Sequence, residues 1–322
     1  MKNLDFLVIG AQKAGTTSLF EYVRHHPGLH LPSEKEVSYF NLESRVARGW
    51  EWYLDWVFAD APRDRPWGTF STFYMDAAVG REDTVPRRIR EAAPDVKLIA
   101  IVRDPVERAI SHHRMSVMKR LEGRSFEQAI DELLEDGALT EARLGPTEAN
   151  SYITRGEYGR AIGNFLEVFP REQVLVIFAE DLDRDPAAVL REIFSFVGVD
   201  AEFVPPNVGE RYRRAGEQRR IASLDLHGWR QRLAARPSVR GAWERLPASV
   251  RRAVDRRVRV VSYRVELWNA RQRGQAAAPE IDAALISRLT DHFRPDVDRL
   301  RELTGVEPPW PRFGRAPSHT RP

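Results

Sequence analysis

The stretch that decides the fold is LDFLVIGAQKAGTTSLFEYV, residues 4–23. Residues 4–9 are mostly apolar, which is typical of a buried strand, and residues 16–25 carry apolar side chains at helical spacing. Between them lies a short loop from Gly10 to Gly15. A strand, loop and helix in this order direct backbone N–H groups and the positive end of the helix dipole towards one point. We therefore expect the loop to bind an anion.

The loop departs from that of nucleoside triphosphatases. Gly10 and Gly15 have the spacing of G-x-x-x-x-G-K-[ST], but Thr16 stands in the place of the lysine, and the only lysine in the loop is Lys13. Such enzymes also need a carboxylate at the end of a neighbouring strand to hold Mg²⁺. The strand expected over residues 96–102 is followed by arginine instead. Both departures count against a P-loop kinase, which stays as the enzymatic alternative.

A second candidate anion site lies in IVRDPVERAIS, residues 101–111. Arg103 follows a buried strand, at the edge of the sheet where α/β proteins bind ligands. Asp104 and Pro105 are typical of the first residues of a helix, and Ser111 is expected two turns into it. Arg103 and Ser111 could therefore contact one phosphate group.

The rest of the chain alternates between strands and helices. We expect further strands over residues 67–70 and 173–178, helices over 51–57, 84–92, 104–120, 126–134, 158–169 and 186–197, and a last helix over 281–303. This alternation predicts an α/β fold with a mainly parallel sheet. We expect a core over residues 1–206, an arginine-rich, mostly helical segment over 207–278, and a C-terminal helix and tail over 279–322.

Composition restricts the function further. The 322 residues contain no cysteine, which excludes disulfides, thiolate catalysis and cysteine-ligated metals. Neither a signal peptide nor an apolar run of about 20 residues is visible, so we expect a cytoplasmic protein. The net charge is +3, but residues 211–273 contain 18 arginines against five acidic residues. This arginine patch would attract an anionic substrate, a nucleotide, a membrane surface or nucleic acid.

These motifs resemble one known family. GAQKAGTTSL, residues 10–19, closely resembles the 5′-phosphosulfate loop of sulfotransferases that use 3′-phosphoadenosine 5′-phosphosulfate (PAPS), and residues 103–111 resemble their 3′-phosphate motif. KEVSYF, residues 35–40, is similar to an element of the heparan sulfate and bacterial branch. RGEY (155–158) and VLVIFAEDL (174–182) follow the order of that branch. The resemblance covers about residues 4–200 and implies a three-layer, P-loop-like core.

The resemblance also implies residue roles. Lys13 and Glu36 would be catalytic, as the cation beside the leaving phosphate and as the general base; His25, His26 and His30 are the rival bases. The donor would contact Lys13, Ala14, Gly15, Thr16, Thr17, Ser18, Arg103 and Ser111, together with a late loop at Arg213, Arg214 and Gly216. Lys35, Phe70, Tyr74 and Tyr158 would face the substrate. Phe70 stands where this branch has a lysine.

The leading interpretation is thus a PAPS-dependent O-sulfotransferase that uses no metal. Its acceptor would be a small molecule, a glycan or a lipid. A protein that binds nucleic acid or another anionic ligand through the arginine patch is the non-enzymatic alternative; we expect no nucleic-acid partner, and contact of the patch with a membrane surface stays open.

Overall fold

The core of the fold is a parallel sheet of four strands, β1 (Phe6–Gly10), β2 (Gly68–Phe70), β3 (Lys97–Val102) and β4 (Val174–Phe178). The computed structural model describes residues 3–80, 84–210, 212 and 281–314. The strands lie in the order β2-β1-β3-β4, with Val8 opposite both Phe70 and Ile99. Every residue of β1 is buried, which explains the continuous apolar run seen in the sequence.

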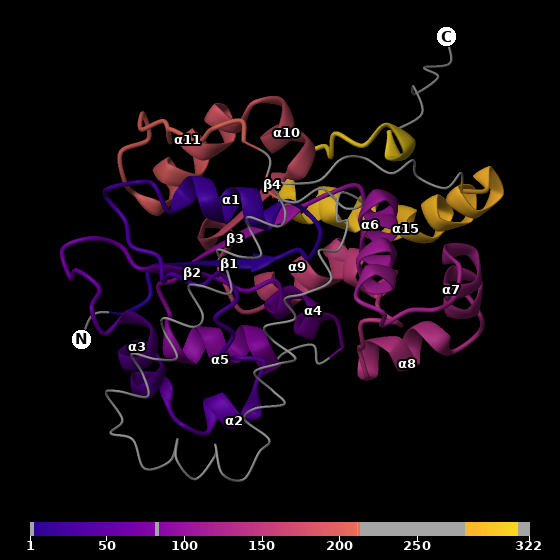
Figure 1. Cartoon of the computed structure of the whole chain (residues 1–322), viewed down its shortest axis with the longest axis horizontal. Coiled ribbons are helices and arrows are strands. Elements are labelled where there is room, and N and C mark those ends of the chain that lie inside the picture. The colour runs from indigo at the N-terminus through magenta and orange to yellow at the C-terminus, as the bar shows by residue number, and fades with distance from the viewer. Residues whose placement is uncertain (1–2, 81–83, 211, 213–280, 315–322) are drawn as a thin grey trace, which may run out of the picture. The chain divides into compact units, whose positions relative to one another are not determined.

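Helices cover both faces of this sheet (Figure 1). Helices α1 (Thr16–Val23) and α11 (Pro186–Val197) lie on one side, and α3 (Trp50–Phe58), α4 (Phe73–Gly80) and α5 (Thr84–Ala92) lie on the other. The predicted three-layer α/β architecture is therefore confirmed. The other described helices are α2 (Glu43–Val46), α6 (Pro105–Met118), α7 (Phe126–Leu133), α8 (Ala138–Leu144), α9 (Tyr158–Leu166), α10 (Ala179–Arg184), α15 (Ala283–Thr304) and the short 3₁₀ turns η1 (Thr154–Gly156), η2 (Arg171–Gln173) and η3 (Pro311–Phe313).

The strand order determines where a ligand can bind. After β1 the chain continues to β2, at one edge of the sheet, and after β3 it continues to β4, at the opposite edge. The crevice between the carboxyl ends of β1 and β3 is therefore a topological switch point. The loop after β1 lies at this crevice, because the N–H of Ala11 donates to the carbonyl of Ile101 at 2.7 Å. The anion loop and Arg103 are therefore neighbours in space.

The C-terminal helix α15 belongs to the same compact unit as the sheet. It packs on α9, where the carboxylate of Asp296 accepts hydrogen bonds of 2.8 Å from the N–H groups of Gly159 and Arg160. A Cβ on Gly159 would lie 2.3 Å from the backbone oxygen of Asp296, so only glycine allows this approach. The predicted boundaries at residues 206 and 278 stay predictions, since residues 213–280 lie outside the described part.

No helix within the described residues is long and apolar enough to cross a membrane.

Candidate active site

The anion loop has a backbone that leaves helix α1 open at its N-terminus. Gly15 is the N-cap residue with φ of 93°, and no side chain caps the helix. That left-handed conformation favours glycine, and Lys13 also lies in it, with φ of 70°. Because Gly15 has no side chain, the N-cap residue itself does not cover the N–H groups at the start of α1. Thr16 is buried, whereas Lys13, Thr17 and Ser18 are half-buried. Such a helix start can hold a phosphate or sulfonate group.

Two small residues allow the loop to lie close to its neighbours. A Cβ on Gly10 would lie 2.5 Å from the sulfur of Met75, so the end of β1 contacts α4 directly. Ala14 is fully buried, and its N–H donates to the carbonyl of Ala11 at 3.3 Å. The loop is therefore held from both sides, by β3 and by α4.

The second predicted anion site follows β3. Arg103 is half-exposed, and among the described residues it forms a long ion pair of 3.7 Å with Glu107, so its guanidinium can still bind a phosphate. Ser111 lies on α6 and is buried. Arg103 thus lies directly after the carboxyl end of β3, and Ser111 lies on the helix that follows it.

Asp104 is a helix cap, as the sequence predicts. One carboxylate oxygen accepts from the N–H of Val106 at 2.9 Å and of Glu107 at 3.2 Å. The other oxygen pairs with Nε of Arg312 at 3.0 Å. With both oxygens engaged, Asp104 is not available as the Mg²⁺ ligand that a P-loop kinase would need at this position.

Glu36 lies beside the end of β2. Its backbone pairs with Phe70 in an isolated parallel bridge. One carboxylate oxygen accepts from Nζ of Lys35 at 2.6 Å, and the other accepts from the N–H of Thr72 at 3.0 Å. The side chain stays 35% exposed, so a third group can still reach the carboxylate. This fixed and accessible carboxylate suits a general base.

The three aromatic residues predicted to face the substrate lie in the protein interior. Phe70 packs edge-on against Phe20, with ring centroids 5.1 Å apart. The hydroxyl of Tyr74 accepts from the N–H of Tyr39 at 2.8 Å, and Tyr158 packs against Trp310. All three are at most 1% exposed. In this structure the three rings are core residues, and their side chains are not accessible to a substrate.

Two of the three rival histidine bases have structural partners. His26 uses both ring nitrogens, on the carbonyl of Asp200 at 2.9 Å and the N–H of Gly28 at 3.0 Å. His25 bonds the carbonyl of Glu21 at 2.7 Å. Burial lowers the pKa of His30. The late loop predicted at Arg213, Arg214 and Gly216 lies outside the described residues.

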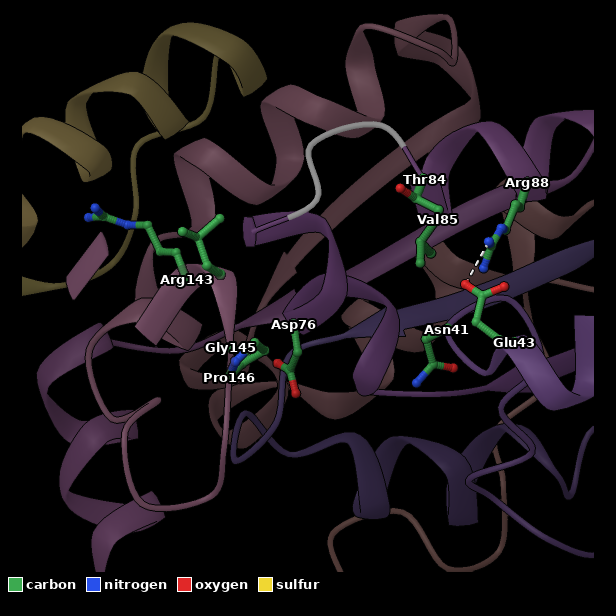
Figure 2. A pocket seen from close by; sticks show the side chains of 10 residues that line it. Asn41, Glu43, Asp76, Thr84, Val85, Arg88, Arg143, Gly145 and Pro146 are labelled. Atoms are coloured by element: carbon green, nitrogen blue, oxygen red, sulfur yellow. Dashed lines mark hydrogen bonds and ion pairs between the residues drawn. The ribbon is translucent and has the colours of Figure 1, made fainter. Parts of the chain in front are cut away.

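A pocket of about 320 Å³ opens next to α4. Figure 2 shows Asp76 on its floor, with Arg88 and Glu43 joined on one side and the guanidinium of Arg143 turned away from Asp76 on the other. Burial raises the pKa of Asp76 to about 6, and the negative charges of Glu148 and Glu36 add to this effect. The complete lining consists of Asn41, Glu43, Asp76, Thr84, Val85, Arg88, Arg143, Leu144, Gly145 and Pro146.

Sequence reasoning did not find the pocket or a buried polar cluster next to it. The cluster consists of Gln12, Asp76, His112, Glu148 and Arg155. Gln12 and Arg155 each lie in a motif seen in the sequence, the loop of residues 10–19 and the RGEY element, but neither motif indicates that they meet. The other members are ordinary polar residues from separate segments, and no local spacing connects them.

Comparison with known proteins agrees with this geometry. The sulfotransferase domain family matches residues 3–218. The human bifunctional heparan sulfate N-deacetylase/N-sulfotransferase 3 is 31% identical over 199 residues, which are 60% of this chain and 22% of that protein. The heparan sulfate glucosamine 3-O-sulfotransferase 3B1 of Mus musculus is 32% identical over 193 residues, which are 60% of this chain and 45% of that protein. The chain thus spans less than half the length of either curated relative.

A solved structure shows the same fold. The crystal structure of a sulfotransferase from Alicyclobacillus acidocaldarius aligns with a TM-score of 0.63 at 23% identity, covering 95% of this chain and 98% of the other. The family match contains the anion loop, Glu36 and Arg103, and it spans more than half of the sequence. The chain therefore belongs to the sulfotransferase domain family.

Proposed function

We propose that the chain transfers the sulfuryl group of PAPS to a hydroxyl group. The observation that carries this is the juxtaposition of the open helix start at Gly15 with Arg103, which offers two anion sites at one switch point. A donor with phosphate groups at both its 5′ and 3′ positions fits such a pair. The sulfotransferase family implies this donor.

The chain's own residues would act as follows. PAPS supplies a sulfuryl group on a phosphate that leaves as the bond breaks. The N–H groups of residues 15–18 and the hydroxyls of Thr16 and Thr17 would bind the phosphosulfate. The ammonium of Lys13 would offset charge on the departing phosphate. Glu36 would take the proton from the acceptor hydroxyl as it attacks in line.

The pocket beside Asp76 would receive the acceptor. Its charged groups are already paired: Arg88 with Glu43 at 2.7 Å, Arg143 with Glu157 at 2.5 Å, and Asp76 with Arg155 at 3.0 Å. In each pair the two charges compensate each other. A further anion would have to displace the carboxylate partner and leave it without its arginine, so these pairs are poor anion sites. We therefore propose an uncharged hydroxylated acceptor, such as a neutral glycoside, in contrast to the heparan sulfate in the names of the relatives.

Binding of the donor tests the proposal first. Calorimetry should show that the product 3′,5′-bisphosphoadenosine (PAP) binds at least ten-fold more tightly than ATP, with or without Mg²⁺. Tighter binding of ATP that depends on Mg²⁺ would favour a kinase instead. Binding of DNA or RNA that weakens steeply with salt, without any binding of PAP, would favour the arginine patch as the functional element.

Transfer of ³⁵S from labelled PAPS then tests the acceptor class. We expect transfer to neutral aryl or alkyl glycosides and little to N-sulfated, uronate-containing oligosaccharides. Thr84→Trp should fill the pocket, raising the KM of the acceptor while leaving the KM of PAPS unchanged. Equal use of the sulfated oligosaccharides, or a variant with unchanged acceptor KM, would contradict this assignment.

A further inference from the structure

A single arginine connects the anion loop with the floor of the pocket. Arg155 lies in the turn η1, and its side chain is 7% exposed. Its Nη1 donates to Oε1 of Gln12 at 2.8 Å and to Oε1 of Glu148 at 3.2 Å. Its Nε forms an ion pair with Oδ2 of Asp76 at 3.0 Å. Gln12 precedes Lys13 in the loop, and Asp76 lies on α4.

The surroundings hold Arg155 in one orientation. Burial lowers the pKa of His112 to about 3, so its imidazole is neutral; its Nε2 lies 3.1 Å from Oε2 of Glu148, to which the Nε2–H tautomer can donate, and 3.2 Å from Nη1 of Arg155. The hydrogen bond from His112 keeps the pKa of Glu148 well below its usual range, against the effect of burial, and Arg155 adds to it. Glu148 thus remains an anion that accepts from both His112 and Arg155.

The backbone next to Arg155 is equally restricted. A Cβ on Gly156 would lie 2.9 Å from the ring of Phe293 on α15 and 3.2 Å from Cβ of Pro105 on α6. The turn η1 is therefore pressed against two helices, and this contact sets the position from which Arg155 extends.

The loop depends on such outside contacts. Lys13 has φ of 70°, a conformation that is unfavourable for a non-glycine residue and persists only where neighbours enforce it. The contacts given above for the loop are two backbone hydrogen bonds of Ala11 and Ala14, the packing of Gly10 on Met75, and the Gln12 side chain on Arg155. Two of these contacts are next to Lys13: the backbone hydrogen bond of Ala14 on one side, which stays within the loop, and the Gln12 side chain on the other, which reaches a distant segment.

We propose that Arg155 is a positioning residue for sulfuryl transfer, which holds Gln12 of the donor loop and Asp76 of the acceptor pocket in one fixed geometry. Arg155 fixes the backbone next to Lys13 through its bond to Gln12, and it fixes the position of α4 through its ion pair with Asp76. The guanidinium is suited to this because its planar fork can bond two partners in set directions while a third pairs with Nε. The inference rests on the proposed function for its link to catalysis, but not for its link to the loop.

Two conservative variants test it. Gln12→Met keeps the bulk of a half-buried side chain and removes the amide, and Arg155→Lys keeps the charge and removes the fork. Hydrogen exchange of a peptide covering residues 8–20 should become faster in both variants without any ligand. Turnover with PAPS and a neutral glycoside should fall about 10- to 100-fold, the usual effect of misplacing a positioned group. The KM of the glycoside should change little in Gln12→Met.

The double variant and a control separate positioning from general stability. Both changes break the bond between Arg155 and Gln12, and Gln12→Met also removes a long contact of 3.5 Å from Nε2 of Gln12 to Oε1 of Glu148, so the loss in the double variant should be clearly smaller than the product of the two single losses. Arg301→Lys is the matched control: Arg301 is also buried, but it bonds Glu307 and the carbonyl of Phe313. It should lower the melting temperature without changing loop exchange or turnover.

Each outcome decides a separate question. Unchanged loop exchange in Gln12→Met, or multiplied losses in the double variant, would overturn the positioning role. If Arg155→Lys fails to fold, Gln12→Met alone still decides it. A wild-type chain that neither binds PAP nor transfers sulfate would overturn the proposed function, while the exchange measurement would still decide whether Arg155 holds the loop.

Discussion

The Asp76 carboxylate should make the stability of the protein fall as the pH rises. Burial raises the pKa of Asp76 to about 6 from an ordinary value of 3.8, although the positive charges of Arg155 and Arg108 act in the opposite direction. The cost of removing the carboxylate from water thus exceeds the attraction of two nearby guanidinium groups. Asp76→Asn removes this titration and keeps the shape of the side chain.

The sign and size follow from proton linkage. Between pH 3.8 and about 6 the folded chain binds a proton at Asp76 that the unfolded chain has released. The free energy of unfolding therefore decreases as the pH rises through this window, by about 3 kcal/mol in total. About 2 kcal/mol of this lies between pH 4.5 and pH 7.5, since the unfolded carboxylate is already mostly ionised at pH 4.5.

Urea unfolding of both proteins at pH 4.5 and pH 7.5 measures the effect. The stability of the wild type relative to Asp76→Asn should decrease by about 2 kcal/mol from the lower to the higher pH, because contributions from other groups cancel in the difference. Asp131→Asn, which removes an exposed carboxylate paired with exposed Arg288, should show almost no such change. A constant difference would refute the reasoning. A difference that increases with pH would show that the ion pair with Arg155 outweighs burial.

Three further predictions concern catalysis. Lys13→Ala should lower turnover about 10²- to 10³-fold with little change in melting temperature, and normal turnover would remove Lys13 from the mechanism. Arg103→Ala should weaken PAP and PAPS by a charge-assisted contact of about 1.5–3 kcal/mol while leaving adenosine 5′-phosphosulfate nearly unchanged, and equal loss for both would place Arg103 elsewhere. Glu36→Gln should still be stabilised thermally by PAP but lose about 10²- to 10⁴-fold in transfer to an alcohol; if transfer persists, His30 is the next base to test.

Much of the fold could be predicted because its signals are local. The apolar runs of β1, β3 and β4 are buried on both faces of a parallel sheet, and their predicted bounds match the structure within a few residues. Asp104 followed by proline predicted the start of α6, and the cap is present. The helices α4, α8 and α10 were not predicted. Helix α4 contacts both β1 and α9, so its position depends on packing with distant segments.

The residues of the candidate site form the same two groups: those recognised from a local motif and those brought together only by packing. The sequence by itself predicted the anion loop, the arginine after β3 and the general base at Glu36, because loop chemistry and spacing within one segment are enough to propose these roles, which stay predictions. Only the tertiary structure decided that Phe70, Tyr74 and Tyr158 are interior residues and that the five-residue polar cluster exists. Gln12 and Arg155 are 143 positions apart. Contacts across such distances arise from the packing of strands and helices, and neither periodicity nor spacing along the chain encodes them.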